Sequence, residues 1–594
     1  MKKGIILSVL LMTIVLSGCK ALKTYPIIEI GNIEYSVDSI VFEIDIIDPD
    51  SVGEVTAIEL FLGDELEESF SDLTKREFLD LTSNLEYDIK VTYTFDLKDG
   101  LGEQNLVASY TFVIVDATFE TIFENLELYF PKVITSNLTL PDFSTVDTSL
   151  SYDIDCADIV RNRIVYTYPS DTTTCNIVIE ATYKDEMRTK NIEVVMSSID
   201  DLPRIPEIHI NTINNTVVDS KEYYVDATLN LIPNEGSEFE GLNNVSLRIK
   251  LRGNSTLYMP KKSYKIKFDD KQLLLSTYQE KTWVLLANFS DQTLIRNHIA
   301  YSMSENLGME FAPGQTLVDV YLNGEYLGNY LLSDQIEVSS NRVNVEEEVP
   351  DLDTGYLVEL DLGLYREGLE NTEENYFLIN GIPFVVKSPK YDKDYYREGH
   401  LTYIQNYFED VYYTLQNNEN YSDLIDIDSF IDWFIVNEVF KNVDSGYSSV
   451  YFFKDKGGKL KMGPVWDFDL STGNPGHLGD DLRGPEGWYT SRSDKNVFFY
   501  YLMQYPEFEE QLKERWNEVY ESVILRTLDD VLLVSDSIVY SSYMNFLKWD
   551  IIGINYDWYT APEIYDLKTY DEQVWFLHDY LEARIEWLNE EINK

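Results

Sequence analysis

The chain has 594 residues, of which 44% are hydrophobic and 14% aromatic, and its formal net charge is −57. This length exceeds what one hydrophobic core supports, and the apolar content is typical of folded domains rather than disordered chain. The acidic excess excludes nucleic acid as a partner, because binding a phosphate backbone requires a surplus of Lys and Arg.

The first 19 residues have the pattern of an export signal. Lys2 and Lys3 precede an apolar run over residues 5–16, which ends in Leu16-Ser17-Gly18-Cys19. This ending resembles the lipobox of bacterial lipoproteins, which implies removal of residues 1–18 and lipid attachment at Cys19. The apolar run is too short to span a bilayer comfortably, whereas two or more acyl chains anchor a protein stably. We expect a protein on the extracytoplasmic face of a bacterial membrane, in contact with that membrane through its lipid anchor only.

Residues 19–116 alternate short apolar runs with polar turns, as in Ile40–Ile44 and Tyr87–Tyr93. This spacing predicts an all-β sandwich of the immunoglobulin type. The segment Leu81–Tyr87 resembles a corner between two strands of fibronectin type III modules. We expect this first domain, like the one that follows, to be a spacer, with an adhesion module as the alternative.

Residues 117–199 predict a second all-β sandwich, with strands at Leu126–Phe130, Ile177–Tyr183 and Lys190–Val195. It resembles the small bacterial immunoglobulin-like domains that separate the parts of surface proteins. Because an oxidising exterior permits Cys156 and Cys175 to pair, we expect a disulfide there rather than two buried thiols. Scattered His residues and the absence of CxxC and HExxH motifs argue against a zinc site or a Ser-His-Asp triad.

A charged, Pro-containing joint over residues 200–206 opens the third region, 200–594. Strands with basic residues come first, at Val245–Leu251 and Ser263–Phe268. Helical spacing of apolar residues follows at 294–307, 427–441, 508–523 and 572–592. This order predicts an α+β domain with two lobes.

Two acidic segments stand out in this region. A predicted helix delivers Asp444, and a short hairpin over residues 449–462 separates it from Trp466-Asp467-Phe468-Asp469. Helix, acidic loop, hairpin and acidic loop is the order of the catalytic segment in phosphoryl transfer, where one carboxylate orients the attacking hydroxyl and another holds Mg²⁺. The plainer interpretation is that these Asp residues cap turns and helix ends.

Several further motifs resemble the CotH kinase family, which is named for a spore coat protein and described as secreted, atypical protein kinases. They run in the family's order over roughly residues 207–530: Arg252-Gly253-Asn254-Ser255-Thr256, Lys261–Phe268, Trp283–Asn288, Asp291–Asn297, Asn323–Tyr330 and Pro464–Asp469. The resemblance implies a two-lobed, kinase-like fold and ATP with Mg²⁺ or Mn²⁺ as cofactors.

The resemblance also implies roles for individual residues. Asp444 corresponds to the catalytic Asp that receives the proton of the acceptor hydroxyl, and Asp467 and Asp469 correspond to metal ligands. The residues expected to bind the nucleotide phosphates are Arg252, Asn254, Ser255, Lys265 and Lys267. For the two Lys residues, a solvated strand face is the alternative.

The sequence departs from ordinary protein kinases at several positions. Ser449 stands where the kinase catalytic loop has Asn, and Asp469 replaces the Gly of the DFG motif. The GxGxxG motif is absent. Three candidates remain open for the acidic partner of the phosphate-binding Lys, namely Glu305, Glu337 and Glu359.

The sequence therefore predicts a lipid-anchored, ATP-dependent protein Ser/Thr kinase that acts on surface or coat proteins. A surface adhesin or coat-assembly scaffold that uses a kinase-like domain without catalysis is the alternative. A third reading is a carbohydrate-active enzyme with paired carboxylates, which requires two carboxyl groups roughly 5–10 Å apart across an open groove.

Overall fold

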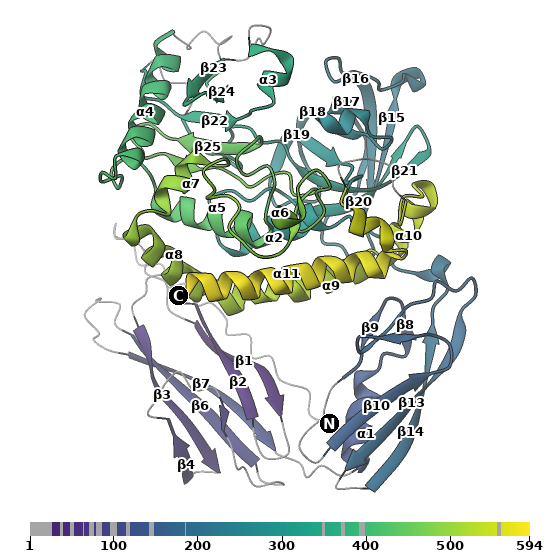
Figure 1. Cartoon of the computed structure of the whole chain (residues 1–594). Helices are drawn as coiled ribbons and strands as arrows, with labels where there is room; N and C mark the ends of the chain where they lie inside the picture. Colours follow the sequence, from purple (N-terminus) through teal and green to yellow (C-terminus); the bar gives the residue numbers. More distant parts are fainter. Residues whose placement is uncertain are drawn as a thin grey trace, which may run out of the picture. The chain divides into compact units, whose positions relative to one another are not determined.

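The computed structural model describes residues 27–594 except 36–39, 48–52, 63–64, 71–76, 79–85, 96–103, 114–118, 142–147, 184–185, 347–350, 370–374, 391–397 and 555–559. The chain divides into two compact units, Met1–Ser197 and Ser198–Lys594 (Figure 1). The predicted signal segment, Cys19 and most of the predicted fibronectin-type corner lie outside the described residues. Within the described ranges, no helix combines the length and apolar character needed to cross a bilayer.

The first unit begins with two antiparallel sheets. One has the order β1 (Ile27–Tyr35), β2 (Ile40–Ile47), β5 (Glu77–Phe78), and the other the order β4 (Glu65–Ser69), β3 (Gly53–Leu62), β6 (Glu86–Phe95), β7 (Gln104–Val113). Alternate residues of both sheets are buried in one core, for example Phe42, Ile58 and Ile89. This alternation produces the layered β structure that the sequence predicts.

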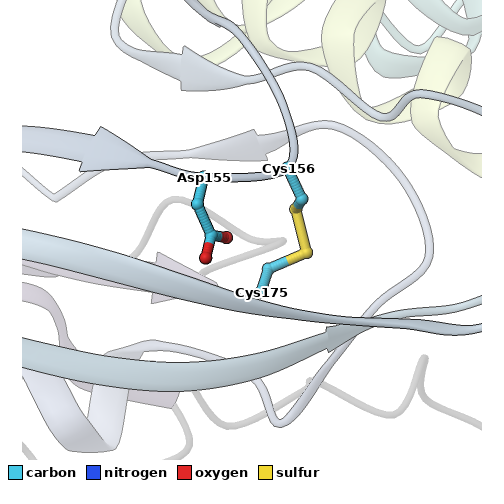
Figure 2. Close-up of side chains that lie close together, drawn as sticks. All are labelled: Asp155, Cys156 and Cys175. Carbon is cyan, nitrogen blue, oxygen red and sulfur yellow. A yellow bond between two sulfur atoms is a disulfide. The ribbon is translucent and has the colours of Figure 1, made fainter.

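The second part of this unit combines a helix with two sheets. One sheet has the order β10 (Thr148–Ile154), β13 (Thr173–Tyr183), β14 (Glu186–Met196), β8 (Val133–Ile134), and the other the order β11 (Ile159–Val160), β12 (Arg163–Ile164), β9 (Leu138–Thr139). Cys156 and Cys175 form a disulfide beside Asp155, with their Cα atoms 5.6 Å apart (Figure 2).

The predicted strand at Leu126–Phe130 is wrong, because α1 (Phe119–Tyr129) covers most of it. The buried side chains Phe119, Ile122 and Leu126 recur at helical spacing, whereas Leu128 is exposed. The local alternation of Leu126, Leu128 and Phe130 looks like a strand only if the preceding turn of apolar residues is left out.

The second unit opens with a closed barrel. Its seven strands are β15 (Glu207–Thr212), β16 (Val225–Ile232), β17 (Leu242–Arg252), β18 (Ser263–Leu273), β19 (Gln279–Leu286), β21 (Glu325–Asp334) and β20 (Thr316–Leu322), in that spatial order. Parallel pairing of β20 with β15 closes it. Ile249 and Ile266 are buried in the barrel core, so the intervening residues of β17 and β18 point outward.

A sheet and a set of helices follow the barrel. The sheet has the order β23 (Tyr376–Ile379), β24 (Ile382–Ser388), β22 (Tyr356–Leu360), β25 (Val450–Lys454), β26 (Lys461–Met462). The helices are α2 (Arg296–Asn306), α3 (Leu364–Glu367), α4 (Glu398–Gln416), α5 (Ile427–Val439), α6 (Asp480–Arg483), α7 (Val497–Leu502), α8 (Pro506–Val519), α9 (Arg526–Ser537), α10 (Val539–Lys548) and α11 (Tyr570–Ile592) (Figure 1). The helix predicted over 508–523 is shorter, because α8 ends at Val519 and a π-helical turn, Tyr520–Leu525, leads into α9.

Helix α5 is the element that positions the first acidic segment. Asp426 caps its N-terminus by accepting a hydrogen bond from the Ser429 backbone N–H at 3.2 Å, and the apolar residues of α5 are buried. At its C-terminal end, Glu438 forms a buried ion pair with Arg584 of α11, with Oε2 and Nη2 2.6 Å apart. The Glu438 carboxylate also accepts hydrogen bonds from the backbone N–H groups of Tyr489 and Thr490. This one carboxylate therefore joins α5, α11 and the segment that precedes α7.

We expect the substitution Glu438→Ala to lower the free energy of unfolding of the second unit by about 3–5 kcal/mol, because it leaves the Arg584 charge buried and unpaired. The measurement is urea denaturation followed by circular dichroism. Glu586→Ala, at an exposed position of the same α11, is the control and changes stability by no more than about 0.5 kcal/mol. Equal losses in the two variants would contradict this role for Glu438.

Candidate functional site

The first acidic loop, Asp444–Ser449, begins where α5 ends. Lys441 adopts a left-handed backbone conformation (φ 47°), which breaks the helix and turns the chain. The Asn442 backbone N–H donates to Asn437 O at 2.9 Å, and the Asn442 side chain accepts from the Asp444 N–H at 3.0 Å. A buried Asn thus fixes the backbone of Asp444 immediately after the helix.

The second acidic loop, Trp466–Asp469, is held by its aromatic residues. Trp466 and Phe468 are buried and both contact the ring of Tyr301, at centroid distances of 5.5 and 6.3 Å. Asp467, between them, has a φ of 66°, a left-handed conformation that few non-glycine residues adopt. Such a conformation persists only where the surroundings fix it, and it is more frequent at functional sites than elsewhere.

Asn442 connects the two loops. Its side-chain amide donates to Trp466 O at 3.3 Å, while its side-chain oxygen accepts from the Asp444 N–H. Because the Asn442 side chain is buried, both bonds form in a low-dielectric environment where they are strong. The spacing between Asp444 and Asp467 is therefore set by one side chain rather than by the intervening hairpin alone.

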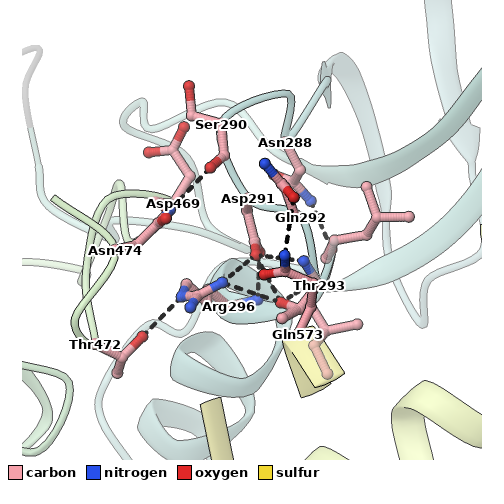
Figure 3. Close-up of polar contacts among 12 residues, drawn as sticks. Asn288, Ser290, Asp291, Gln292, Thr293, Arg296, Asp469, Thr472, Asn474 and Gln573 are labelled. Atoms are coloured by element: carbon pink, nitrogen blue, oxygen red, sulfur yellow. Dashed lines mark hydrogen bonds and ion pairs between the residues drawn. The ribbon is translucent and has the colours of Figure 1, made fainter. Parts of the chain in front are cut away.

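A buried polar network attaches the second loop to the barrel through α2 (Figure 3). Asp291 forms an ion pair with Arg296. Its carboxylate also accepts a hydrogen bond at 2.8 Å from the Arg296 backbone N–H, the first of α2, and so acts as the cap of this helix. Arg296 Nε donates to Thr472 Oγ1 at 2.8 Å, and Asn474 Nδ2 donates to Asp469 O at 2.6 Å. The segment 291–297 is thus a structural support, to which Asn297 adds an acceptor for the Phe468 N–H at 2.7 Å.

Three carboxyl groups face one another in this site. Asp444, Asp467 and Asp469 are all half-buried. Burial and the charge of Asp467 raise the pKa of Asp444 to about 8, while Arg366 and Lys495 oppose that shift. Burial also raises the pKa of Asp467, against the charge of Arg252. The pKa of Asp469 is raised well above its ordinary value by burial and by Asp467.

The residues fit a divalent cation bound by Asp467 and Asp469. The two carboxyl groups share a hydrogen bond, so their oxygens are close enough to bind one ion. The ligand atoms of Asp444, Asp467 and Asp469 do not all lie within 4.8 Å of one another. The three carboxyl groups therefore do not form one compact ligand set, and a metal ion is assigned to Asp467 and Asp469 alone.

The Gly253 loop follows β17, directly after Arg252. Gly253 has a φ of 98°, and a Cβ atom there would lie 1.9 Å from Thr256 Oγ1, so the turn requires Gly. Arg252 lies over the ring of Trp466 at 5.5 Å. This contact brings the barrel loop to the second acidic loop.

A basic cavity of about 260 Å³ opens beside the Gly253 loop, lined by Lys221, Lys250, Leu251, Arg252, Gly253, Asn254 and Lys265. Lys250 stands directly opposite Lys265 in the β17–β18 ladder, and Arg248 directly opposite Lys267. Like charges in such pairs destabilise a sheet. Among the described residues, no carboxylate lies within 4.0 Å of Lys250, Arg252 or Lys265. An anionic ligand in this cavity would neutralise them.

Of the three acidic candidates, Glu337 interacts with Lys265. Burial raises the pKa of Glu337, and the charges of Arg342 and Lys265 oppose that shift. Glu305 instead accepts a hydrogen bond from Gln315, and Glu359 pairs with Lys387 at 3.1 Å. Sequence order alone does not separate the three, because Glu337 follows β21 and comes near Lys265 of β18 only when β18, β19 and β21 assemble side by side.

The structure brings most of the predicted site residues together. Asp444, Asp467, Asp469 and Arg252 meet at the two acidic loops, and Asn254 and Lys265 line the basic cavity. Lys267 lies on the same strand face but does not line the cavity, and Ser255 begins the 3-10 turn Ser255–Tyr258. Sequence reasoning missed Lys221, Lys250, Arg366, Asn442 and Lys495, which come from segments without a recognisable motif.

Comparison with known proteins supports one family. Residues 249–588, more than half of the chain, match the family model described as "CotH kinase protein". No curated protein matches. Six chains of solved structures match, among them the FN1-FN3 domains of chicken CNTN1, with 11% identity over 41% of this chain and 93% of that chain. The TM-score of that match is 0.11, which carries no argument about fold.

The affinity of the basic cavity for inorganic triphosphate should fall as pH rises through 8. Burial lowers the pKa of Lys265 to about 8, and Lys250 and Arg252 add to the shift while Glu337 opposes it. Above that pH the free protein loses the Lys265 charge, which weakens binding by up to about tenfold per pH unit. Isothermal titration calorimetry between pH 7 and 9.5 measures this dependence.

The matched variant for this experiment is Lys265→Arg, which keeps its charge throughout the range. Because the triphosphate itself also ionises over this range, the pH profile of Lys265→Arg measures the contribution of the ligand alone. Identical pH profiles for the wild type and Lys265→Arg would contradict a role of Lys265 in binding the anion.

Proposed function

The chain belongs to the CotH kinase family, and from this premise we propose that it is an atypical protein kinase that transfers the γ-phosphoryl group of ATP to Ser or Thr hydroxyls. The observation that carries the proposal is the pairing of the two acidic loops through Asn442. These bonds join the loop that carries Asp444 to the loop that carries Asp467 and Asp469, the two carboxyl groups to which we assign a metal ion. This division of roles is what phosphoryl transfer requires.

Asp444 is the group that orients the acceptor hydroxyl and receives its proton. It is half-buried at the exit of α5. Burial and the charge of Asp467 raise its pKa to about 8, while the cations Arg366 and Lys495 oppose that rise, and a carboxyl group with a pKa near neutral can take up the hydroxyl proton and release it again. Asp467 and Asp469 would hold Mg²⁺ or Mn²⁺, and the bound ion would supply positive charge to the phosphate oxygens of the nucleotide.

The donor phosphates bind at the barrel side of the site. Arg252 faces both Trp466 and Asp467, and Lys265 lines the basic cavity next to the Gly253 loop. Four cations around this cavity in a chain of net charge −57 are best explained by an anionic ligand. We assign Asn254, Ser255 and Lys267 to the same phosphate-binding region.

The two departures from ordinary kinases are compatible with this function. The Ser449 hydroxyl hydrogen-bonds to Asp467, so it orients a metal ligand instead of binding metal as Asn would. Asp469 replaces a Gly and supplies a second carboxylate to the same metal. In this proposal the Asp469 carboxylate takes over the metal-binding role that the amide of the catalytic-loop Asn has in ordinary kinases.

We further propose that the protein acts outside the membrane, anchored through lipid on Cys19, and that its acceptors are surface or coat proteins. The pattern of residues 1–19 and the Cys156–Cys175 disulfide support an oxidising, extracytoplasmic location. The two β-rich domains serve as spacers between the anchor and the kinase domain.

Purified full-length protein with radiolabelled ATP, Mn²⁺ and casein should show label transfer to casein or to the chain itself. We expect Asp444→Asn to lower kcat by about 10²–10⁴-fold, because the isosteric amide cannot accept the proton. Asp467→Asn should abolish metal-dependent transfer. Asp428→Asn, at an exposed position on the first turn of α5, is the control and should keep wild-type activity.

No transfer by the wild type with either metal, together with no nucleotide-dependent thermal shift, would contradict the kinase proposal. It would favour a non-catalytic adhesin or assembly scaffold. Cleavage of a glycoside substrate that depends on both Asp444 and Asp467 would favour a carbohydrate-active enzyme instead.

Lipid anchoring has its own test in membrane fractionation. The wild type should sediment with membranes, and Cys19→Ala should lose thiol acylation and its membrane association. Fatty-acid labelling followed by gel electrophoresis measures the modification directly. A labelled Cys19→Ala protein would contradict attachment at this residue.

A further inference from the structure

Lys495 reaches the site from a segment that sequence motifs did not identify. It lies just before α7, and its Nζ stands 5.0 Å over the ring centroid of Tyr489. Tyr489 is buried, and its hydroxyl donates to Val443 O at 3.2 Å. One aromatic ring therefore separates the Lys495 ammonium from the residue that precedes Asp444.

The backbone of Lys495 is locked against the first acidic loop. A Cβ atom built on Gly446 would lie 2.5 Å from the Lys495 carbonyl carbon and 2.7 Å from Asn496 N, so only Gly permits this approach. The Asn496 side chain donates to Ser445 O at 2.9 Å. The backbone at Lys495 and Asn496 is thus fixed against the loop that carries Asp444.

The first acidic loop has no positive charge of its own, since residues 444–449 read Asp-Ser-Gly-Tyr-Ser-Ser. Asp361 and Asp467 add negative charge around Asp444, and the described cations that act on it are Arg366 and Lys495. Arg366 is exposed and stacks over Tyr447 at 5.3 Å. The Lys495 side chain is only 21% exposed, which makes its charge more effective.

Lys495 is not neutralised by a close partner among the described residues. Its ion pair with Asp494 spans 3.9 Å, and Asp494 makes a closer contact, at 3.0 Å, with Arg492. Asp494 is 57% exposed, so water screens its charge. The ammonium of Lys495 remains available to an anionic group beside Asp444.

In phosphoryl transfer, the phosphoryl group that moves to the acceptor would be an anionic group beside Asp444. A bond forms between the acceptor oxygen and the γ-phosphorus as the bond from that phosphorus to the oxygen of ADP breaks, and the hydroxyl proton passes to Asp444. Negative charge spreads over the three equatorial oxygens during this step. Arg252 and Lys265 lie on the barrel side, so a cation next to Asp444 stabilises the charge from the acceptor side.

We propose that Lys495 is a catalytic residue that contacts the transferred phosphoryl group from the acceptor side, a role that rests on the proposed kinase function. Its position depends on Gly446 and Tyr489, which hold it beside Asp444. The segment 489–496 therefore supplies to the site a cation that the first acidic loop lacks.

The test compares Lys495→Met, which keeps the apolar stem over Tyr489, with Lys495→Arg, which keeps the charge. Full-length protein is assayed with ATP, Mn²⁺ and casein. We expect Lys495→Met to lower kcat about 10²–10³-fold with the KM for ATP within about twofold, as for loss of one transition-state contact. Lys495→Arg should retain at least about a tenth of the wild-type kcat.

Lys513→Met is the control, because Lys513 contacts Asn593 near the end of α11 and should leave kcat unchanged. Wild-type kcat in Lys495→Met, or equal losses in Lys495→Met and Lys495→Arg, would overturn the catalytic role. So would a tenfold rise in the KM for ATP with kcat unchanged. An inactive wild type would instead overturn the kinase proposal and this inference together.

Discussion

Repulsion among Asp444, Asp467 and Asp469 is the constraint on which the rest of the site depends. Like charges held close together in a half-buried site raise one another's pKa values and oppose folding. The Asn442 side chain joins the two acidic loops, because it donates to Trp466 O and accepts from the Asp444 N–H, and the Trp466 ring packs on Tyr301. The fold tolerates this arrangement because the side chains that support the two loops, among them Asn442 and Trp466, are buried.

Positive charge approaches these carboxylates from two directions. On the barrel side, Arg252 and Lys265 come from paired strands, where Lys250 and Lys265 face each other without a carboxylate between them. On the other side, Lys495 comes from the segment before α7. In the proposed kinase, these cations would contact the phosphates, and Asp444 would orient the acceptor hydroxyl.

Local patterns predicted much of the fold and the centre of the site. The helix that delivers Asp444 and the hairpin that follows it are encoded by apolar spacing over fewer than forty residues, so they could be predicted. The helix at 119–129 was mistaken for a strand because alternation and helical spacing overlap in short apolar runs. Lys495 and Glu337 could not be assigned, because their neighbours are set by the order of strands in the barrel and by the packing of Gly446.

Calorimetric titration of ATP into the protein, with and without Mn²⁺, is the most direct test that the two acidic loops form a metal–nucleotide site. We expect Mn²⁺ to strengthen ATP binding at least tenfold in the wild type. Asp467→Asn should remove this enhancement but keep the metal-independent affinity supplied by Arg252 and Lys265. Equal enhancement by Mn²⁺ in the wild type and in Asp467→Asn would contradict this expectation.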